Sequence, residues 1–138
     1  MKPVFADTSY YLALVNPVDP RHEMSVDLAE GLLGRTFVTE YVLVELGSAL
    51  SRGSDRLVYL DLLDKVQSDR ATTIISASES LFRQGVALFA ARPDKDWSLL
   101  DCISFVVMKQ RRLKEPLTTD RHFVQAGFRA LLREGDQA

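Results

Sequence analysis

Four acidic residues that are far apart in this chain share an apolar setting, in which a charge is costly. They are Asp7, Glu45, Asp101 and Asp120. A carboxylate among apolar groups must be paired, hydrogen-bonded, protonated or bound to a metal. If the fold brings the four together, their oxygens suit a hard divalent cation such as Mg²⁺ or Mn²⁺. A metal held in this way can support chemistry on phosphodiesters, because it activates water and neutralises phosphate charge.

Each acid also has an interpretation in which it only supports the fold. Asp7 and Asp120 could each be the N-cap of a helix that follows. Asp101 stands three residues after Ser98, which is the spacing of a capping box. Glu45 lies past the first turn of its expected helix, so capping does not account for it. The sequence leaves the structural and the metal-binding interpretations open, and one residue could serve both.

The elements that would position these acids alternate between strands and helices. Short apolar or β-branched runs predict strands at 4–6, 36–38, 72–75 and 116–118, with a weaker fifth at 128–132. Helical patterns predict helices at 8–15, 22–33, 40–51, 56–68 and 99–113, and another that starts after Ser76 or Ser78 and ends at 91. Buried strands that alternate with helices indicate an α/β domain with a central, mostly parallel sheet flanked by helices.

This arrangement predicts where the acids meet. Sites in open parallel sheets lie at the carboxyl ends of the strands. Asp7 and Asp120 directly follow predicted strands, while Glu45 and Asp101 fall near the starts of helices. We therefore expect all four carboxylates at one edge of the sheet.

Composition limits the class of protein. The chain has 138 residues, of which 46% are hydrophobic and 26% charged, so we expect one globular domain over residues 1–138. We see no signal-peptide pattern and no apolar run long enough to span a bilayer. The lone Cys102 cannot form an internal disulfide, and its apolar surroundings favour a core position. These features predict a protein of the reducing cytoplasm.

Charge is distributed unevenly along the chain. The net charge is only −2, which argues against non-specific coating of nucleic acid. Residues 109–133, however, hold seven basic and two acidic residues. They could be ordinary solvated surface, or a rim that attracts phosphates beside the acidic pocket. Arg111, Arg112 and Arg121 are the candidates for phosphate contacts.

Four stretches together carry a family resemblance: residues 4–9, 39–46, 97–105 and 117–128, each of which contains one of the acids. In this order and spacing they resemble the PIN-domain nucleases, of the kind found as VapC-type toxins of bacterial toxin–antitoxin pairs. The resemblance implies a three-layer fold and metal-dependent endonucleolytic cleavage of RNA, with Mg²⁺ or Mn²⁺ held by the four acids. Ser9 matches a hydroxyl residue that can join the metal shell. The resemblance also implies an antitoxin partner and a homodimer.

Other functions remain to be weighed against this one. Single-stranded RNA is the expected substrate, because an unpaired backbone can enter a narrow acidic cleft. The chain could instead be a free-standing PIN nuclease in RNA processing, or a non-catalytic module that binds a metal or a partner's arginine. A phosphatase with Asp7 as nucleophile would need a second Asp where Ser9 stands. His22 and His122 are poor catalytic candidates: His22 is expected at the surface near the start of a helix, and His122 in a structural role, with contact to substrate as the alternative.

Overall fold

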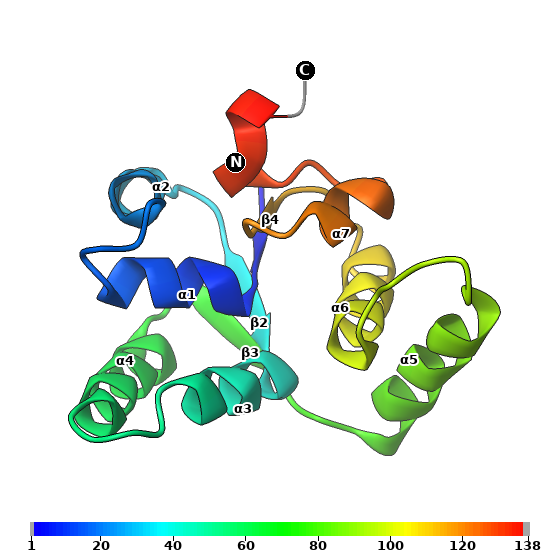
Figure 1. Ribbon diagram of the computed structural model, residues 1–138, viewed down its shortest axis with the longest axis horizontal. Coiled ribbons are helices and arrows are strands. Elements are labelled where there is room, and N and C mark those ends of the chain that lie inside the picture. The colour runs from blue at the N-terminus through cyan, green and yellow to red at the C-terminus, as the bar shows by residue number, and fades with distance from the viewer. Residues whose placement is uncertain (1, 137–138) are drawn as a thin grey trace.

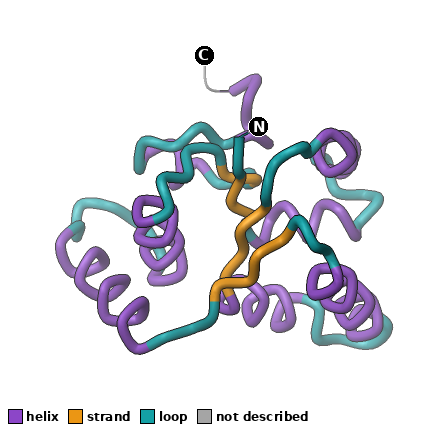
Figure 2. Tube along the Cα trace, turned by 180° about the vertical axis from the view of Figure 1, so that it is seen from behind, coloured by secondary structure: helices purple, strands orange, loops and turns teal. Residues whose placement is uncertain are grey.

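Four parallel strands form the centre of the molecule. The computed structural model describes residues 2–136, with side chains through Arg133. The strands are β1 (Val4–Ala6), β2 (Thr36–Thr39), β3 (Thr72–Ile75) and β4 (Pro116–Leu117). They lie in the order β3-β2-β1-β4, and every pair is parallel. Figure 2 shows these short strands crossing the middle of the molecule. The predicted α/β class and parallel sheet are confirmed.

Helices cover the sheet on both sides and make three layers (Figure 1). Helices α1 to α4 gather on one side, and α5 to α7 on the other. The helices are α1 (Thr8–Val15), α2 (His22–Gly31), α3 (Glu40–Ala49), α4 (Asp55–Ser68), α5 (Glu79–Ala91), α6 (Leu99–Gln110) and α7 (Arg121–Gln125), followed by the 3₁₀ helix η1 (Leu131–Asp136). None of the helices in residues 2–136 has the length and apolar character that a membrane span needs.

Parallel pairing brings the carboxyl ends of β1 and β4 together. Ala6 is in register with Leu117, and the amide N–H of Asp7 donates to the Leu117 carbonyl at 3.1 Å. The residues that follow these two strands are therefore neighbours, although they are more than 100 positions apart. On the other side of β1, β2 leads directly into α3, where Thr39 Oγ1 accepts from the Val42 N–H at 3.1 Å as an N-cap.

The predicted fifth strand is wrong. Residues 128–130 are irregular, and the chain then enters η1. The Arg129 N–H donates to the Lys114 carbonyl at 3.0 Å, which is an isolated backbone contact next to β4 and not a ladder. Three helices are shorter than expected: α2 ends at Gly31, α3 at Ala49 and α6 at Gln110. Pro20, expected at the first position of α2, precedes that helix in a turn.

Helix α6 ends at Gln110 rather than at residue 113, because the backbone turns there. Arg112 has a φ of +57°, in the left-handed region that favours glycine. The N–H of Leu113 then donates to the Met108 carbonyl at 2.8 Å, which closes the helix with the long-range bond of a Schellman motif. The left-handed arginine is the only non-glycine residue with positive φ in the described part of the chain.

Close packing fixes the position of α6, which carries Asp101. Phe105 lies edge-on to both Trp97 and Phe123, with ring centroids 5.0 and 4.9 Å apart. On the outer side, Gly85 of α5 lets that helix approach so closely that a Cβ there would collide with the Ile103 side chain. Helix α6 is therefore held from two directions, one turn beyond Asp101.

Candidate active site

The four predicted acids line one pocket at the carboxyl edge of the sheet. Asp7, Glu45, Asp101 and Asp120 come from four different elements, and the cavity that they share has a volume of about 440 Å³. The remaining lining residues are Thr8, Ser9, Leu12, Asp96, Ser98, Thr119 and His122. The convergence expected from the positions of the strands and helices is present in the structure.

Asp7 is the most deeply desolvated acid of the pocket. Its side chain lies directly after β1, and the residue is 7% exposed. Burial raises the pKa of the Asp7 carboxyl to about 7, and the negative charges of Asp101 and Glu45 add to this effect. A hydrogen bond from Thr118 Oγ1, at 2.7 Å, acts in the opposite direction. Among the described side chains no lysine or arginine forms an ion pair with Asp7, so its charge is uncompensated.

Hydroxyl groups hold the Asp7 carboxylate in place. Ser9 Oγ lies 3.4 Å from Asp7 Oδ2 and 3.2 Å from Thr118 Oγ1, and it accepts the Thr119 N–H at 3.0 Å. These contacts join the start of α1 to the segment after β4. Ser9 thus stands beside the acid, where the resemblance expects it, and Thr118 is a further site residue that sequence reasoning missed.

Asp101 serves the fold and the pocket at the same time. Its Oδ2 accepts the Ser98 N–H at 3.0 Å, and its own N–H donates to Ser98 Oγ at 3.0 Å, so the capping box exists. The residue is nevertheless buried and lines the acidic pocket. The two interpretations of this acid are therefore compatible.

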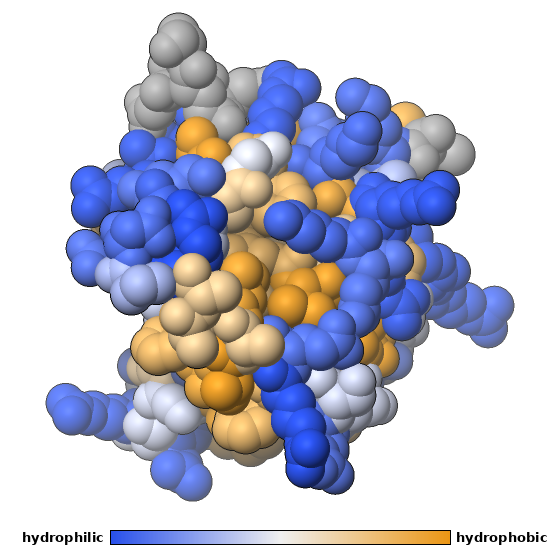
Figure 3. Space-filling model, turned by 90° about the vertical axis from the view of Figure 1, so that its right-hand side faces the viewer, coloured by the Kyte–Doolittle hydropathy of each residue, from blue (hydrophilic) through white to orange (hydrophobic). Residues whose placement is uncertain are grey.

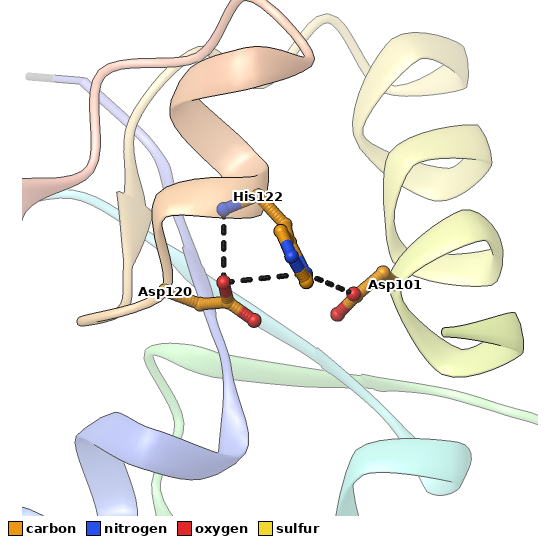
Figure 4. A group of neighbouring side chains, drawn as sticks. All are labelled: Asp101, Asp120 and His122. Atoms are coloured by element: carbon orange, nitrogen blue, oxygen red, sulfur yellow. Dashed lines mark hydrogen bonds and ion pairs between the residues drawn. The ribbon is translucent and has the colours of Figure 1, made fainter. Parts of the chain in front are cut away.

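Asp120 and His122 form a second part of the site. Asp120 N-caps α7 through the His122 N–H, which donates to Asp120 Oδ1 at 2.8 Å. The His122 ring turns inward between two acids, with Nδ1 at 2.9 Å from Asp101 Oδ2 and 3.4 Å from Asp120 Oδ1 (Figure 4). Ligand atoms of Asp101, Asp120 and His122 lie within 4.8 Å of one another, which is close enough to share an ion.

The contact of His122 with both acids was not expected from the sequence. The available signal was its place two residues after Asp120, in the first turn of a helix. That signal does not reveal which way the ring turns, because the direction depends on how α7 packs against α6. The ring contacts two carboxylates and lines the pocket, so the structural role and contact with substrate both stay predictions.

Glu45 differs from the expectation of apolar surroundings, because it is exposed. Val42 and Leu46 of the same helix are fully buried, and Glu45 lies on the solvent side of α3. Its charge is therefore much less costly than that of Asp7. Glu45 still borders the pocket, and its negative charge contributes to the raised pKa of Asp7.

The predicted basic rim is divided between the two ends of the molecule. Arg121 begins α7 beside Asp120 and is exposed, so it can reach the mouth of the pocket. Arg111 and Arg112 lie beyond the other end of α6, about 15–17 Å along the helix axis from Asp101. The Arg111 guanidinium lies over the Phe37 ring, 5.1 Å from its centroid. The structure does not bring these two arginines to the acids.

Two other arginines border the acids instead. Arg21 and Arg133 line a neighbouring cavity of about 480 Å³, which shares Ser9 and Thr119 with the acidic pocket. Arg133 Nη1 donates to the Thr119 carbonyl at 3.0 Å. Arg133 belongs to the basic segment 109–133 but was not among the three named candidates, and Arg21 lies outside that segment.

The donor set fits a hard divalent cation. All four acids offer carboxylate oxygens, which Mg²⁺ and Mn²⁺ prefer, and the buried Asp7 has no compensating cation among the described side chains. Like charges at short range repel each other unless a proton or a metal neutralises them. A divalent ion would relieve this repulsion.

Comparison with known proteins gives one family match and several solved structures of similar fold. The sequence matches the PIN domain family over residues 4–129. Among solved structures, VapC20 from Mycobacterium tuberculosis, described as a sarcin-ricin loop cleaving toxin, is similar with a TM-score of 0.83 and 22% identity, over 91% of this chain and 95% of that one. VapBC2 from Rickettsia felis, bound to a promoter DNA fragment, gives a TM-score of 0.65 at 15% identity, over 91% and 93% of the two chains.

The similarity extends to a third solved structure, but not to curated sequences. FitAcB from Neisseria gonorrhoeae gives a TM-score of 0.62 at 17% identity, over 89% of this chain and 91% of that one. Comparison with curated proteins gives no match. The three solved structures share the fold, and the family match spans the whole sheet and all four acids. The chain therefore belongs to the PIN domain family.

Proposed function

We propose that this protein is a metal-dependent endoribonuclease that cleaves single-stranded RNA. The observation that carries the proposal is the shared pocket in which Asp7, Glu45, Asp101 and Asp120 meet without a compensating lysine or arginine among the described side chains. The phosphates of RNA need a cation to enter such a pocket, because like charges repel. Membership of the PIN domain family supports the same reading.

Each residue has a defined task in this proposal. The four acids would hold Mg²⁺ or Mn²⁺, and Ser9 could complete the shell. The cation, when bound, makes hydroxide available near neutral pH and shields the phosphate. Thr118 and Ser9 fix the Asp7 carboxylate through their hydroxyls.

The remaining polar groups set the geometry around the acids. Ser98 and His122 both contact Asp101 Oδ2, which leaves its rotamer little freedom. Arg121 follows Asp120 at the start of α7, and Arg133 lines the cavity next to the acidic pocket, which makes them our candidates for contacts with the phosphates that flank the cut. These arginines would position the RNA backbone, since phosphate contacts set register rather than sequence preference.

RNA cleavage by the purified protein tests this function. We expect single-stranded RNA to be cut in the presence of Mn²⁺ and to stay intact in excess chelator, because the carboxylates alone repel the phosphate. Restoring Mn²⁺ should restore cleavage. A preparation that cuts RNA equally well in chelator would contradict metal dependence. One that binds Mn²⁺ and never cuts would favour the alternative of a non-catalytic metal-binding module.

We further propose that the chain is the cytoplasmic toxin of a toxin–antitoxin pair. VapC20 is described as a sarcin-ricin loop cleaving toxin, and VapBC2 was solved bound to a DNA fragment from its promoter. The surface of α3 and α4 offers an apolar face for an antitoxin, where Val44, Leu57 and Leu60 are 68%, 72% and 57% exposed. A free-standing nuclease in RNA processing is the alternative.

The proposed homodimer has its own candidate surface. Phe82 and Phe89 of α5 are 47% and 50% exposed, and Val86 lies on the same helix. Figure 3 views the molecule from the side of α5 and α6 and shows apolar surface bordered by hydrophilic side chains. A second copy could cover this face.

Purification from the native cell tests both partners. We expect a small DNA-binding protein to co-purify with the tagged chain. Leu57→Glu should abolish that association, because a charge on the α3/α4 face opposes apolar burial. Phe89→Glu should leave the association intact and convert a dimer into a monomer in size-exclusion chromatography. A chain that purifies alone and is harmless when overexpressed would favour the free-standing nuclease.

A further inference from the structure

A second, larger cavity lies at the opposite edge of the sheet from the acids. Its volume is about 830 Å³, and it is formed where the start of β1, the end of α6 and the turn after α7 meet. None of the four acids lines it. We call it the amino-edge groove, because it borders the amino ends of β1 and β4.

Positive charge dominates the amino-edge groove. Five cations line it, namely Lys2, Lys109, Arg112, Lys114 and Arg129, against a single acid, Glu115. Arg129 Nη1 already pairs with Glu115 Oε2 at 3.2 Å. Among the described side chains, none of the other four cations forms an ion pair with a carboxylate. The basic segment at 109–133 therefore collects largely here rather than around the acids.

The backbone at Arg112 indicates that its side chain has a use beyond folding. Its φ of +57° lies where glycine is favoured, because a Cβ there crowds the following carbonyl. A glycine would close α6 with less strain. The arginine side chain is exposed and lines the groove, so it contributes charge and little packing. Strained residues of this kind concentrate at binding sites.

The floor of the groove is apolar. Met108 and Leu113 lie beneath it, nearly or fully buried, and Phe128 is partly exposed beside them. A basic rim suits a single nucleic-acid strand, because its phosphates can meet the cations. Met108 and Leu113 are too buried to contact a ligand, so Phe128 is the aromatic side chain on which a base could lie.

We propose that the amino-edge groove is an exosite for the RNA backbone, at a distance from the cut. The proposal rests on the proposed function, because the same RNA would reach both sites. Arg112 lies eleven residues after Asp101, about 17 Å along α6. At about 3.4 Å per phosphate, roughly five nucleotides of a stacked strand separate the two sites. Substrates shorter than this cannot occupy both.

RNA binding in chelator tests the exosite without cleavage. The probes are fluorescent single-stranded RNAs of roughly 20 and 4 nucleotides, and in chelator both should bind at the groove, because the acids without a cation repel phosphate. For Arg112→Gly we expect three- to tenfold weaker binding of both RNAs and a log K against log salt slope that is shallower by about 0.7. Its melting temperature should equal or exceed that of the parent. Arg83→Gln, an exposed arginine on α5, is the matched control and should bind like the parent.

Two results would overturn the exosite. One is equal affinity of the parent and Arg112→Gly for the long RNA at low salt. The other is that the variant keeps its RNA affinity and loses affinity for a polyglutamate peptide, which would assign the groove to an acidic protein segment. Failure of the proposed nuclease is a separate result: RNA binding that depends on Arg112, without cleavage in Mn²⁺, leaves the exosite standing.

Discussion

Replacing Asp101 by Asn is expected to slow RNA cleavage by roughly 10²–10³-fold, while the fold stays intact. The variant loses one of the two buried negative charges of the pocket, and with it part of the affinity for a divalent cation. Its amide oxygen can still accept the Ser98 N–H, so the capping box and the first turn of α6 are largely preserved. Initial rates at saturating Mn²⁺ and circular dichroism of both proteins measure the two effects.

Asp96 provides the matched control for this experiment. It lines the same pocket, but it is exposed and is not one of the four predicted ligands. Asp96→Asn should therefore keep most of the parental rate. If Asp101→Asn cleaves like the parent, or if both variants lose activity equally, the assignment of Asp101 as a ligand is wrong. A partly unfolded Asp101→Asn would show that capping is its main task.

Asp7→Asn is expected to make the metal-free protein more stable at pH 8, by about 2–4 kcal/mol. The pKa of Asp7 is raised to about 7 in the folded state, whereas an unfolded chain has an ordinary value near 3.8. Between these values the folded state holds a proton that the unfolded state has released. The parent's free energy of unfolding therefore falls as the pH rises from about 4 to 7. Above about pH 7 the loss of stability is complete.

The asparagine variant removes that pH dependence. Its side chain is neutral at every pH and can still accept from Thr118 Oγ1. Thermal melts in chelator should show a smaller difference between parent and variant at pH 5 than at pH 8, because only part of the loss has occurred at the lower pH. Added Mn²⁺ should then stabilise the parent more than the variant, because a ligand stabilises only the state that binds it. Parallel melting curves across this range would contradict a desolvated Asp7.

Apolar runs and capping residues predicted the positions of the acids, because each of these features determines the backbone only within a few residues of itself along the chain. The bounds of β1 and α1 follow from an apolar run and the acid that ends it, and Ser98 forms the capping box that its spacing to Asp101 predicted. Parallel pairing then places the ends of β1 and β4 side by side. None of these steps needs knowledge of how the layers pack.

Features that depend on how the helices pack against the sheet could not be predicted from such short stretches of sequence. Glu45 was expected in apolar surroundings, but which face of α3 turns inward is decided by the layer around it. The direction of α6 separates Arg112 from Asp101, although the two are close in sequence. The segment at 128–132 has the composition of a strand, yet it meets the edge of β4 through an isolated backbone contact at Arg129.

The opposite charge at the two edges of the sheet gives the molecule a polarity along its strands. Lys2 and Lys114 stand before β1 and β4, while Asp7 and Asp120 stand after them. A polyanion that diffuses toward the protein is attracted to one edge and repelled by the other, so encounters are oriented before any contact forms. Screening at physiological ionic strength reaches about 8 Å, which is shorter than α6. The capture of RNA can therefore depend steeply on salt, while the bond-breaking step at the far edge remains nearly insensitive to it.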